Sequence, residues 1–292
     1  MAGFGWVNRG ISVGFRHPKP LFGGATLVTL AVMIPALTPQ LIQFQAMHAG
    51  APLQPGAFGG IMALSMLLGL LILPLYAGYL QMIDAVARGL PARAGDIIKP
   101  YREGKALRLI GYGLVMLLVY VAMIAIVIAV TGGGFAHWYV QVLIAQANRL
   151  PPPTTLPDGF GITLLLFIVL GIFMIGFYSI SLGQVTLRNR SVFGAIGDGI
   201  IGALKNVLPL LMLAVDIVII WIAVAICFGI LALVLALIGK LVGLWLVFVL
   251  LIPLYIALLL TAFAAMFGVM YHLWRDVCGD DIVRGMTEPL AA

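Results

Sequence analysis

Residues 208–238 read LPLLMLAVDIVIIWIAVAICFGILALVLALI, a run of 31 positions with a single formal charge, at Asp216. A transmembrane helix needs about 20 predominantly apolar residues to cross a hydrocarbon layer of about 30 Å. The run exceeds that length, so it can cross a membrane as one helix. We therefore expect lipid, and not only water, to surround the rest of the chain.

Five other runs share this character. The chain is 63% hydrophobic and 9% charged, whereas a soluble domain is about half apolar and a quarter charged. The basic residues before the first run are typical of a signal peptide, but that run is long, so we expect the first helix to be retained. We predict an all-α polytopic integral membrane protein with six transmembrane helices, at Leu21–Gln45, Phe58–Ile83, Leu107–Thr131, Gly161–Val185, Leu208–Ile238 and Leu241–Tyr271.

The connectors between these runs differ sharply in charge. Of the 16 Lys and Arg residues, only Arg149 and Lys240 follow the third and fifth runs. The others precede the first run or follow the second, fourth and sixth, apart from Arg108, which stands at the start of the third run. Because basic loops stay in the cytoplasm, both termini are predicted to be cytoplasmic, with 273–292 as a cytoplasmic tail. The net charge of +6 then indicates attraction to anionic lipid headgroups of the inner leaflet and not to nucleic acid.

A short pattern recurs before the first, third and fifth runs. Each copy has Ile, a bulky residue four positions later, a basic residue next to it, and then Leu. The i, i+4 spacing puts the two apolar side chains on one helical face, as in a helix that lies in the membrane interface. We predict three units, 5–83, 90–185 and 190–272, each an amphipathic interfacial helix followed by a transmembrane hairpin. The predicted lipid contacts are the basic residues Arg16, Arg102 and Lys205.

Several short motifs resemble a known family. They are Gly5-Trp6, Phe15-Arg16 and Pro18 before the first run, Pro74 and Gly78-Tyr79 in the second, Gly89 in the basic loop, and Arg275-Asp276-Val277 after the sixth. With these the chain resembles uncharacterised proteobacterial inner-membrane proteins with six spans. The resemblance implies the same topology and a bacterial inner-membrane location. It implies no reaction, because that family has no established activity.

Prolines and one long loop predict local irregularities. Pro74 and Pro253 lie inside runs, where the missing N–H bends or breaks a helix. The loop 132–160 contains three consecutive prolines at 151–153. We expect residues 136–149 to form a short helix on the outer surface, followed by an extended stretch that returns to the fourth span. This loop is either a binding loop or a surface linker.

Polar residues in or beside the runs are the candidate functional positions. An ionised carboxylate in hydrocarbon is costly, so Asp216 indicates a proton or cation site, or else an acid paired near the cytoplasmic headgroups. Gln40 and Gln43 lie three residues apart on one helical face, where they line a wet vestibule or join helices by hydrogen bonds. Asp84 and His272, near the cytoplasmic ends of their spans, are the titratable members of a polar ring or else solvated helix ends.

Enzyme motifs are absent from the sequence. It has no phosphate-binding loop, zinc-protease motif or nucleophile elbow, and the four histidines have no metal-ligand spacing. We predict no catalytic residue, metal or cofactor. The leading hypothesis is a non-catalytic membrane component that binds lipid, another membrane protein or a second copy of itself. The competing hypothesis is a transporter or channel for a small or lipid-like substrate, with a pathway near Asp216 and Gln40.

Overall fold

The computed structural model describes residues 2–48, 55–148 and 150–279, and these ranges contain helices and connectors but no strand. Each of the six predicted runs falls on a helix, or a pair of consecutive helices, long and apolar enough to cross a membrane. The all-helical class and the six long apolar segments are thereby confirmed. Their bounds are Pro18–Ala46, Gly56–Ala87, Ala106–Val130, Phe160–Leu187, Val207–Lys240 and Val247–Cys278.

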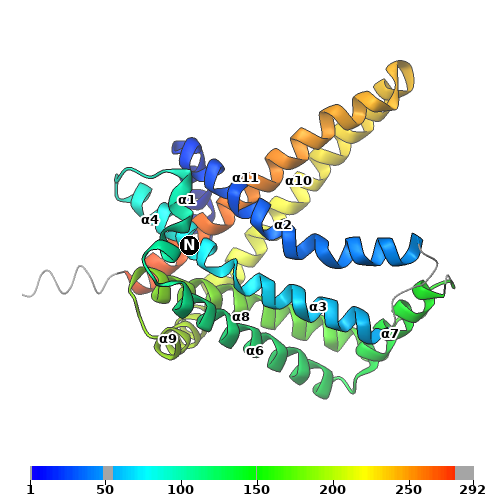
Figure 1. Cartoon of the computed structure of the whole chain (residues 1–292), viewed down its shortest axis with the longest axis horizontal. Coiled ribbons are helices and arrows are strands. Elements are labelled where there is room, and N and C mark those ends of the chain that lie inside the picture. The colour runs from blue at the N-terminus through cyan, green and yellow to red at the C-terminus, as the bar shows by residue number, and fades with distance from the viewer. Residues whose placement is uncertain (1, 49–54, 149, 280–292) are drawn as a thin grey trace, which may run out of the picture.

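Short helices separate several of the long ones (Figure 1). The last helix continues to Cys278, which is beyond the predicted start of the tail at 273, and residues 280–292 lie outside the described ranges. In chain order the elements are α1 (Ala2–Arg16), α2 (Pro18–His48), α3 (Pro55–Leu70), α4 (Leu73–Ala87), the 3-10 helix η1 (Ala94–Ile98), α5 (Lys99–Arg102), α6 (Ala106–Val130), α7 (Gly134–Ala147), α8 (Phe160–Leu187), α9 (Val192–Lys205), α10 (Val207–Val242) and α11 (Leu244–Cys278).

The second span is broken near its middle. A turn at residues 71–72 separates α3 from α4, and Pro74 stands in the first turn of α4. A helix start tolerates proline because the N–H groups there have no partner within the helix. The break predicted at Pro74 is confirmed, whereas α11 passes through Pro253 without interruption.

The long connector between α6 and α8 forms a helix and an irregular return. α7 covers most of the helix predicted at 136–149, and residues 150–159 contain no helix. Trp138 Nε1 donates to the carbonyl oxygen of Thr155 at 3.0 Å. This bond ties the return segment to α7.

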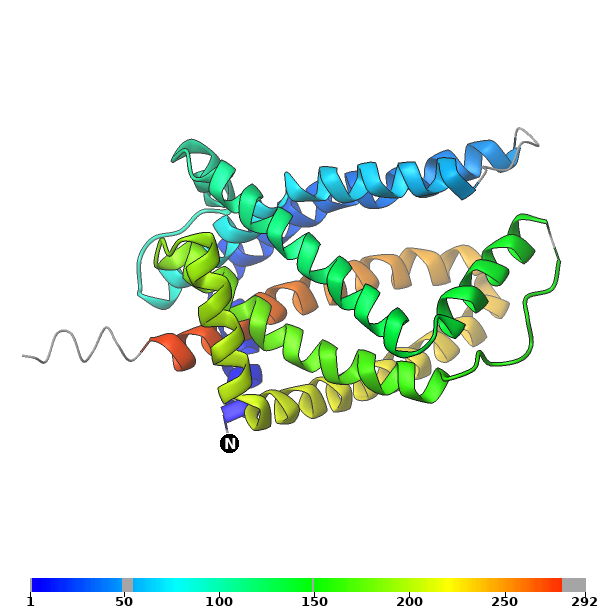
Figure 2. The ribbon, with the colours of Figure 1, turned by 90° about the horizontal axis from the view of Figure 1, so that it is seen from below.

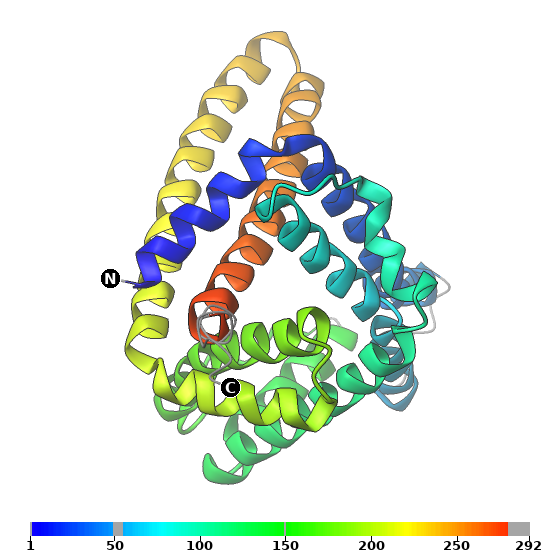
Figure 3. The same cartoon turned by 90° about the vertical axis from the view of Figure 1, so that its left-hand side faces the viewer.

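Three short segments pack against long helices at one end of the molecule. α1 lies on α11, η1 on α4 and α9 on α8. Each segment thus rests on the long helix that precedes it in the chain, and α1, which has no predecessor, rests on the last one. Figure 3 shows the three segments as the sides of a triangle around the ends of α4, α8 and α11. We call this end the basic end, because the connectors that contain Arg88, Arg102, Arg188 and Lys205 lie there.

Glycine makes each of these three contacts close. A Cβ atom added at Gly268 would lie 2.5 Å from the backbone oxygen of Gly10, and one added at Gly78 would lie 2.0 Å from that of Ile97. A Cβ at Gly199 of α9 would lie 2.9 Å from a backbone oxygen of α8. Only a residue without Cβ allows backbones to approach so closely, so these glycines fix how the short segments lie on the long helices.

The three segments nevertheless differ in form. α1 and α9 are single α-helices, whereas the segment before the third span is η1 followed by the four-residue α5. Pro100 lacks the N–H that would extend a helix from Asp96, and the Asp96 carboxylate instead accepts from the N–H of Arg93 at 2.8 Å. The isoleucines that begin the repeated pattern also differ, since Ile97 before the third run is buried and Ile200 before the fifth run is exposed.

Side-chain burial is concentrated at the basic end. Trp6, Tyr79, Tyr112, Tyr271 and others are almost completely buried there. Away from this end the helices diverge in pairs, with α10 and α11 turned away from the others (Figures 1 and 2). The most apolar stretch of α10 has no buried residue, and residues 218–222 are exposed in succession. Because successive helical residues point about 100° apart, this part of α10 exposes apolar side chains on every side.

Candidate functional site

Three carboxylates at the basic end are each paired with an arginine. Two of the pairs join residues that are neighbours in sequence, and one joins the two ends of the chain. In every pair the arginine side chain is more exposed than the carboxylate. Such pairs contribute modestly to stability when exposed, so their main effect is to fix side-chain positions. The pairs are Arg9 with Asp276, Arg88 with Asp84, and Arg190 with Asp198.

Asp276 holds α1 on α11. Its Oδ2 accepts from Trp6 Nε1 at 2.8 Å, and its Oδ1 accepts from Arg9 Nη1 at 3.3 Å. The Trp6 ring is buried between the two helices. The buried face of α1, which also includes Gly10 and Gly14, therefore contacts protein, while Phe15 and Arg16 are exposed.

Asp84 links α4 to α11. Its Oδ1 accepts from Arg88 Nε at 3.0 Å and from the hydroxyl of Tyr271 at 3.1 Å. The aromatic rings one to two turns deeper continue the contact, since Tyr79 and Phe267 lie 5.2 Å apart, centroid to centroid, in an edge-to-face arrangement. The ends of α4 and α11 are thus joined by both a polar and an aromatic contact.

Tyr101 ties the α5 segment to the broken turn of the second span. Its hydroxyl donates to the carbonyl oxygen of Leu71, a group that the break between α3 and α4 leaves outside a regular helix. Partial burial raises the pKa of Tyr101 above its ordinary value of 10.0, so the hydroxyl remains protonated and able to donate.

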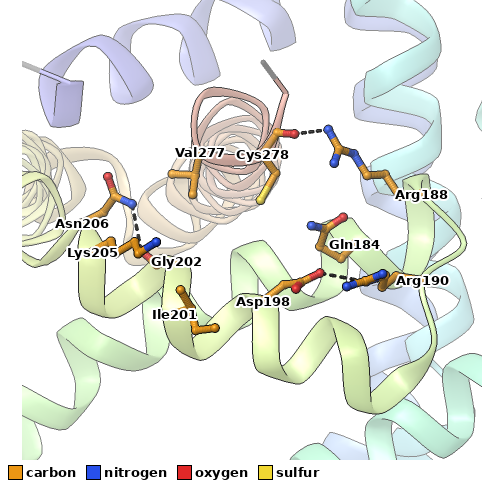
Figure 4. A pocket seen from close by; sticks show the side chains of 10 residues that line it. All are labelled: Gln184, Arg188, Arg190, Asp198, Ile201, Gly202, Lys205, Asn206, Val277 and Cys278. Carbon is orange, nitrogen blue, oxygen red and sulfur yellow. Dashed lines mark hydrogen bonds and ion pairs between the residues drawn. The ribbon is translucent and has the colours of Figure 1, made fainter. Parts of the chain in front are cut away.

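A pocket of about 600 Å³ lies between the ends of α8 and α11 and the length of α9 (Figure 4). Its volume is within the range of about 300–1,000 Å³ that small-molecule sites occupy. Three of its side chains are cationic and one is a carboxylate, which makes it a basic pocket. Its lining residues are Gln184, Arg188, Arg190, Asp198, Ile201, Gly202, Lys205, Asn206, Val277 and Cys278.

The loop before α9 determines the position of Arg190 in the basic pocket. Asn189 adopts a left-handed backbone conformation with φ 54°, which Asn tolerates better than most residues. Arg108 of α6 donates to its Oδ1 at 2.7 Å, and Ser191 then caps α9 by accepting from the N–H of Gly194 at 3.3 Å. Arg190, held in this loop, donates from Nε to Asp198 at 3.1 Å.

Gln184 lies at the inner wall of the basic pocket. The residue is only 6% exposed, and its Oε1 has no hydrogen-bond partner among the described residues. Its neighbour Gly183 lets the ring of Trp274 approach α8 so closely that a Cβ would meet Cδ1 at 2.3 Å. The guanidinium of Arg188 lies over a face of that ring, with its Cζ 5.9 Å from the ring centroid.

Lys205 lines the basic pocket at the C-terminal end of α9, and Arg190 lines it beside the N-terminal end (Figure 4). Lys205 is exposed and has no ion-pair partner in the part of the chain that the structure describes. The next residue, Asn206, turns its amide back to the carbonyl oxygen of Gly202 at 2.8 Å. By formal count the four charged side chains of the pocket sum to +2.

The residues of the predicted pathway do not meet. Gln40 lies 22 residues into α2, about 33 Å along that helix, and Asp216 lies 9 residues into α10, about 14 Å along it. Gln40 is exposed and Gln43 half-buried. Asp216 is half-buried, and its Oδ2 has no hydrogen-bond partner among the described residues. It follows by one turn Leu213, on whose backbone Gly3 of α1 packs, so it lies near the basic end.

The other predicted residues lie at the basic end but in separate places. His272 is 7% exposed, and neither ring nitrogen has a hydrogen-bond partner among the described residues. It is next in sequence to Tyr271, which binds Asp84. Arg16 and Arg102 are both exposed, on α1 and α5. Of the predicted lipid contacts, only Lys205 lines the basic pocket.

The sequence indicated Gln184 only as one member of the predicted polar ring at the cytoplasmic ends of the spans, and it did not single out Asp198 or Arg190. A signal for them was present, because Gln184 ends the fourth run and the two charges flank the start of the next unit. What the sequence did not give was the packing of α9 back along α8, which brings the three together. No cluster of three metal-ligating side chains occurs among the described residues.

The chain matches no protein-family model, no curated protein and no solved structure. Within the residues that the structure describes, the fold is all-helical and has six segments long and apolar enough to span a membrane. The resemblance to six-span proteobacterial proteins remains a prediction from sequence.

Proposed function

We propose that this protein is a non-catalytic component of a bacterial inner membrane that binds anionic phospholipid at its cytoplasmic face. One observation carries the proposal. The tightly packed core and the basic connectors coincide at one end, while the rest of the helices expose apolar side chains on most sides. Apolar helices exposed in this way fit an acyl-chain environment, and basic side chains at one end fit anionic headgroups.

The architecture proposed for this role consists of three units. Each has a segment that lies at the cytoplasmic interface, α1, η1 with α5, or α9, followed by two antiparallel spans. Support comes from the way each segment rests on the preceding long helix, with α1 completing the ring on α11. Both termini and all three segments are then cytoplasmic, in agreement with the distribution of Lys and Arg.

The transport alternative has less support. A pathway needs polar groups close enough together to line one cavity, but Gln40 lies about 33 Å along α2 and Asp216 about 14 Å along α10. The basic pocket is lined by neither residue. We therefore propose lipid binding as the function and keep transport as an outcome of the experiment below. Association with another membrane protein or with a second copy remains compatible with the exposed apolar helices.

The experiment is purification in mild detergent followed by reconstitution into nanodiscs of defined composition. We expect enrichment of anionic over zwitterionic phospholipid in the purified protein, measured by lipid mass spectrometry. Cysteine labelling at position 102 from the cytoplasmic side only would establish the orientation. Equal retention of both lipid classes would contradict the proposal, and solute flux that is abolished by Asp216→Ala would favour transport.

A further inference from the structure

We propose that the basic pocket holds the headgroup of one anionic phospholipid, a phosphodiester that carries hydroxyl groups. This inference rests on the proposed lipid-binding function and names the site and headgroup chemistry. The pocket is not an isolated helix end, since side chains from α8, α9, α11 and the α8–α9 loop converge on it (Figure 4). Its polar side chains divide into donors and acceptors.

The donors suit a phosphate. Lys205 has no ion-pair partner among the described residues, and Arg190 at the other end of α9 uses its Nε for Asp198. A guanidinium has five N–H donors, so Arg190 retains donors for a second anion. Charge-assisted bonds of these groups to phosphate are among the strongest hydrogen bonds in proteins.

The acceptors suit hydroxyl groups. Gln184 Oε1 is buried and has no hydrogen-bond partner among the described residues. A buried acceptor without a partner costs free energy, which a donor from a ligand would recover. Asp198 keeps acceptor capacity beyond its bond to Arg190. Phosphate alone carries no alcohol hydroxyl groups. A glycerol or other polyol headgroup supplies such donors beside its phosphodiester.

The surroundings favour a lipid over a soluble phosphate. Ile201 and Leu204 lie beside Lys205 on α9 and are 54% and 60% exposed, and Leu208 at the start of α10 is 66% exposed. A phospholipid whose headgroup binds Lys205 would have its acyl chains next to these exposed apolar side chains. The acyl chains would follow the exposed surface of α10.

The test measures binding of phosphatidylglycerol, phosphatidic acid and phosphatidylcholine to the full chain in nanodiscs. Loss of one charge-assisted hydrogen bond predicts that Lys205→Gln weakens phosphatidylglycerol binding about tenfold. The matched control is Lys240→Gln, an exposed lysine at the end of α10 that is far from the basic end, with an expected change below about twofold. Gln184→Leu should weaken phosphatidylglycerol binding and leave phosphatidic acid binding unchanged. Lys205 is exposed, so its variant keeps the test valid if the Gln184 variant does not fold.

The outcomes separate this inference from the proposed function. If wild type prefers anionic lipid but Lys205→Gln changes binding no more than Lys240→Gln does, the pocket assignment is wrong and the function stands. If wild type shows no preference for anionic lipid, both are wrong. If water-soluble glycerophosphoglycerol binds as tightly as the lipid, the pocket serves a soluble anion and the lipid assignment is overturned.

Discussion

Gly78→Ala is the substitution whose effect follows most directly from the structure. Gly78 lies where α4 passes beneath η1, and an added Cβ would lie 2.0 Å from the carbonyl oxygen of Ile97 and 2.6 Å from its carbonyl carbon. Both atoms belong to the backbone, so no side-chain rotation relieves the overlap. Ordinary contact begins at 3.4 Å, and η1 must therefore move away by about 1.4 Å in a closely packed region.

The expected cost combines two destabilising effects and one stabilising effect. Overpacking of this kind destabilises proteins by about 1–3 kcal/mol, while Ala in place of Gly in a helix stabilises by about 1 kcal/mol. Displacement of η1 also exposes part of the Ile97 side chain, which is 3% exposed; full burial of such a side chain is worth about 1.5–3 kcal/mol. We expect a net loss of about 1–2 kcal/mol in the free energy of unfolding.

The assay is unfolding in mild detergent by added denaturing detergent, followed by circular dichroism. Two matched controls separate the causes. Gly111→Ala adds a Cβ with nothing within 4 Å, so it should be neutral or stabilising. Gly24→Ala meets the terminal carbon of Met82 at 2.4 Å, and this flexible side chain can move, so it should cost less than Gly78→Ala. If Gly78→Ala were as stable as Gly111→Ala, the backbone contact would be refuted.

Three further results are expected. Asp276→Asn removes the ion pair that anchors α1, so amide hydrogen exchange in α1 should become faster while α8 is unchanged. Tyr112→Phe removes the buried 2.6 Å hydrogen bond to Ser181 and should cost about 1 kcal/mol, with a double-mutant cycle against Ser181→Ala showing strong non-additivity. Because the pKa of Tyr101 is raised, its contribution to stability is complete below pH 10.0 and is lost as pH rises through the folded pKa; Tyr101→Phe should lack that loss.

Much of the fold follows from local pattern alone. The six long apolar helices, the break at Pro74 and the short helix α7 were all predictable, because each depends on a run length or on a residue that cannot continue a helix. The division of Lys and Arg between connectors likewise predicts that they share one end. The form of the segment before the third span was less predictable, since the effect of Pro100 and the Asp96 cap depends on their combination.

The candidate site depended on contacts between distant residues. Asp276 and Arg9 are 267 positions apart, and the local sequence around either residue does not predict that the two will pair. The sequence also drew attention to Asp216 and Gln40 because polar residues are rare in apolar runs, but rarity does not bring residues together. Gln184 lies at the end of a span, where polar residues are expected. It became a site residue only because Asp198 and Lys205 of α9 line the same pocket.

By itself, therefore, the amino-acid sequence determined that the chain is helical, where six helices are long enough to span a membrane, and which connectors are basic. These properties depend on composition over about 20 consecutive residues. The tertiary structure alone decided that α1 rests on α11, that α9 packs back along α8, and that Gln184, Asp198 and Lys205 line one pocket. The physical reason is that such contacts form through close backbone approach at single glycines, among them Gly10, Gly199 and Gly268, and a glycine does not encode which backbone it will meet.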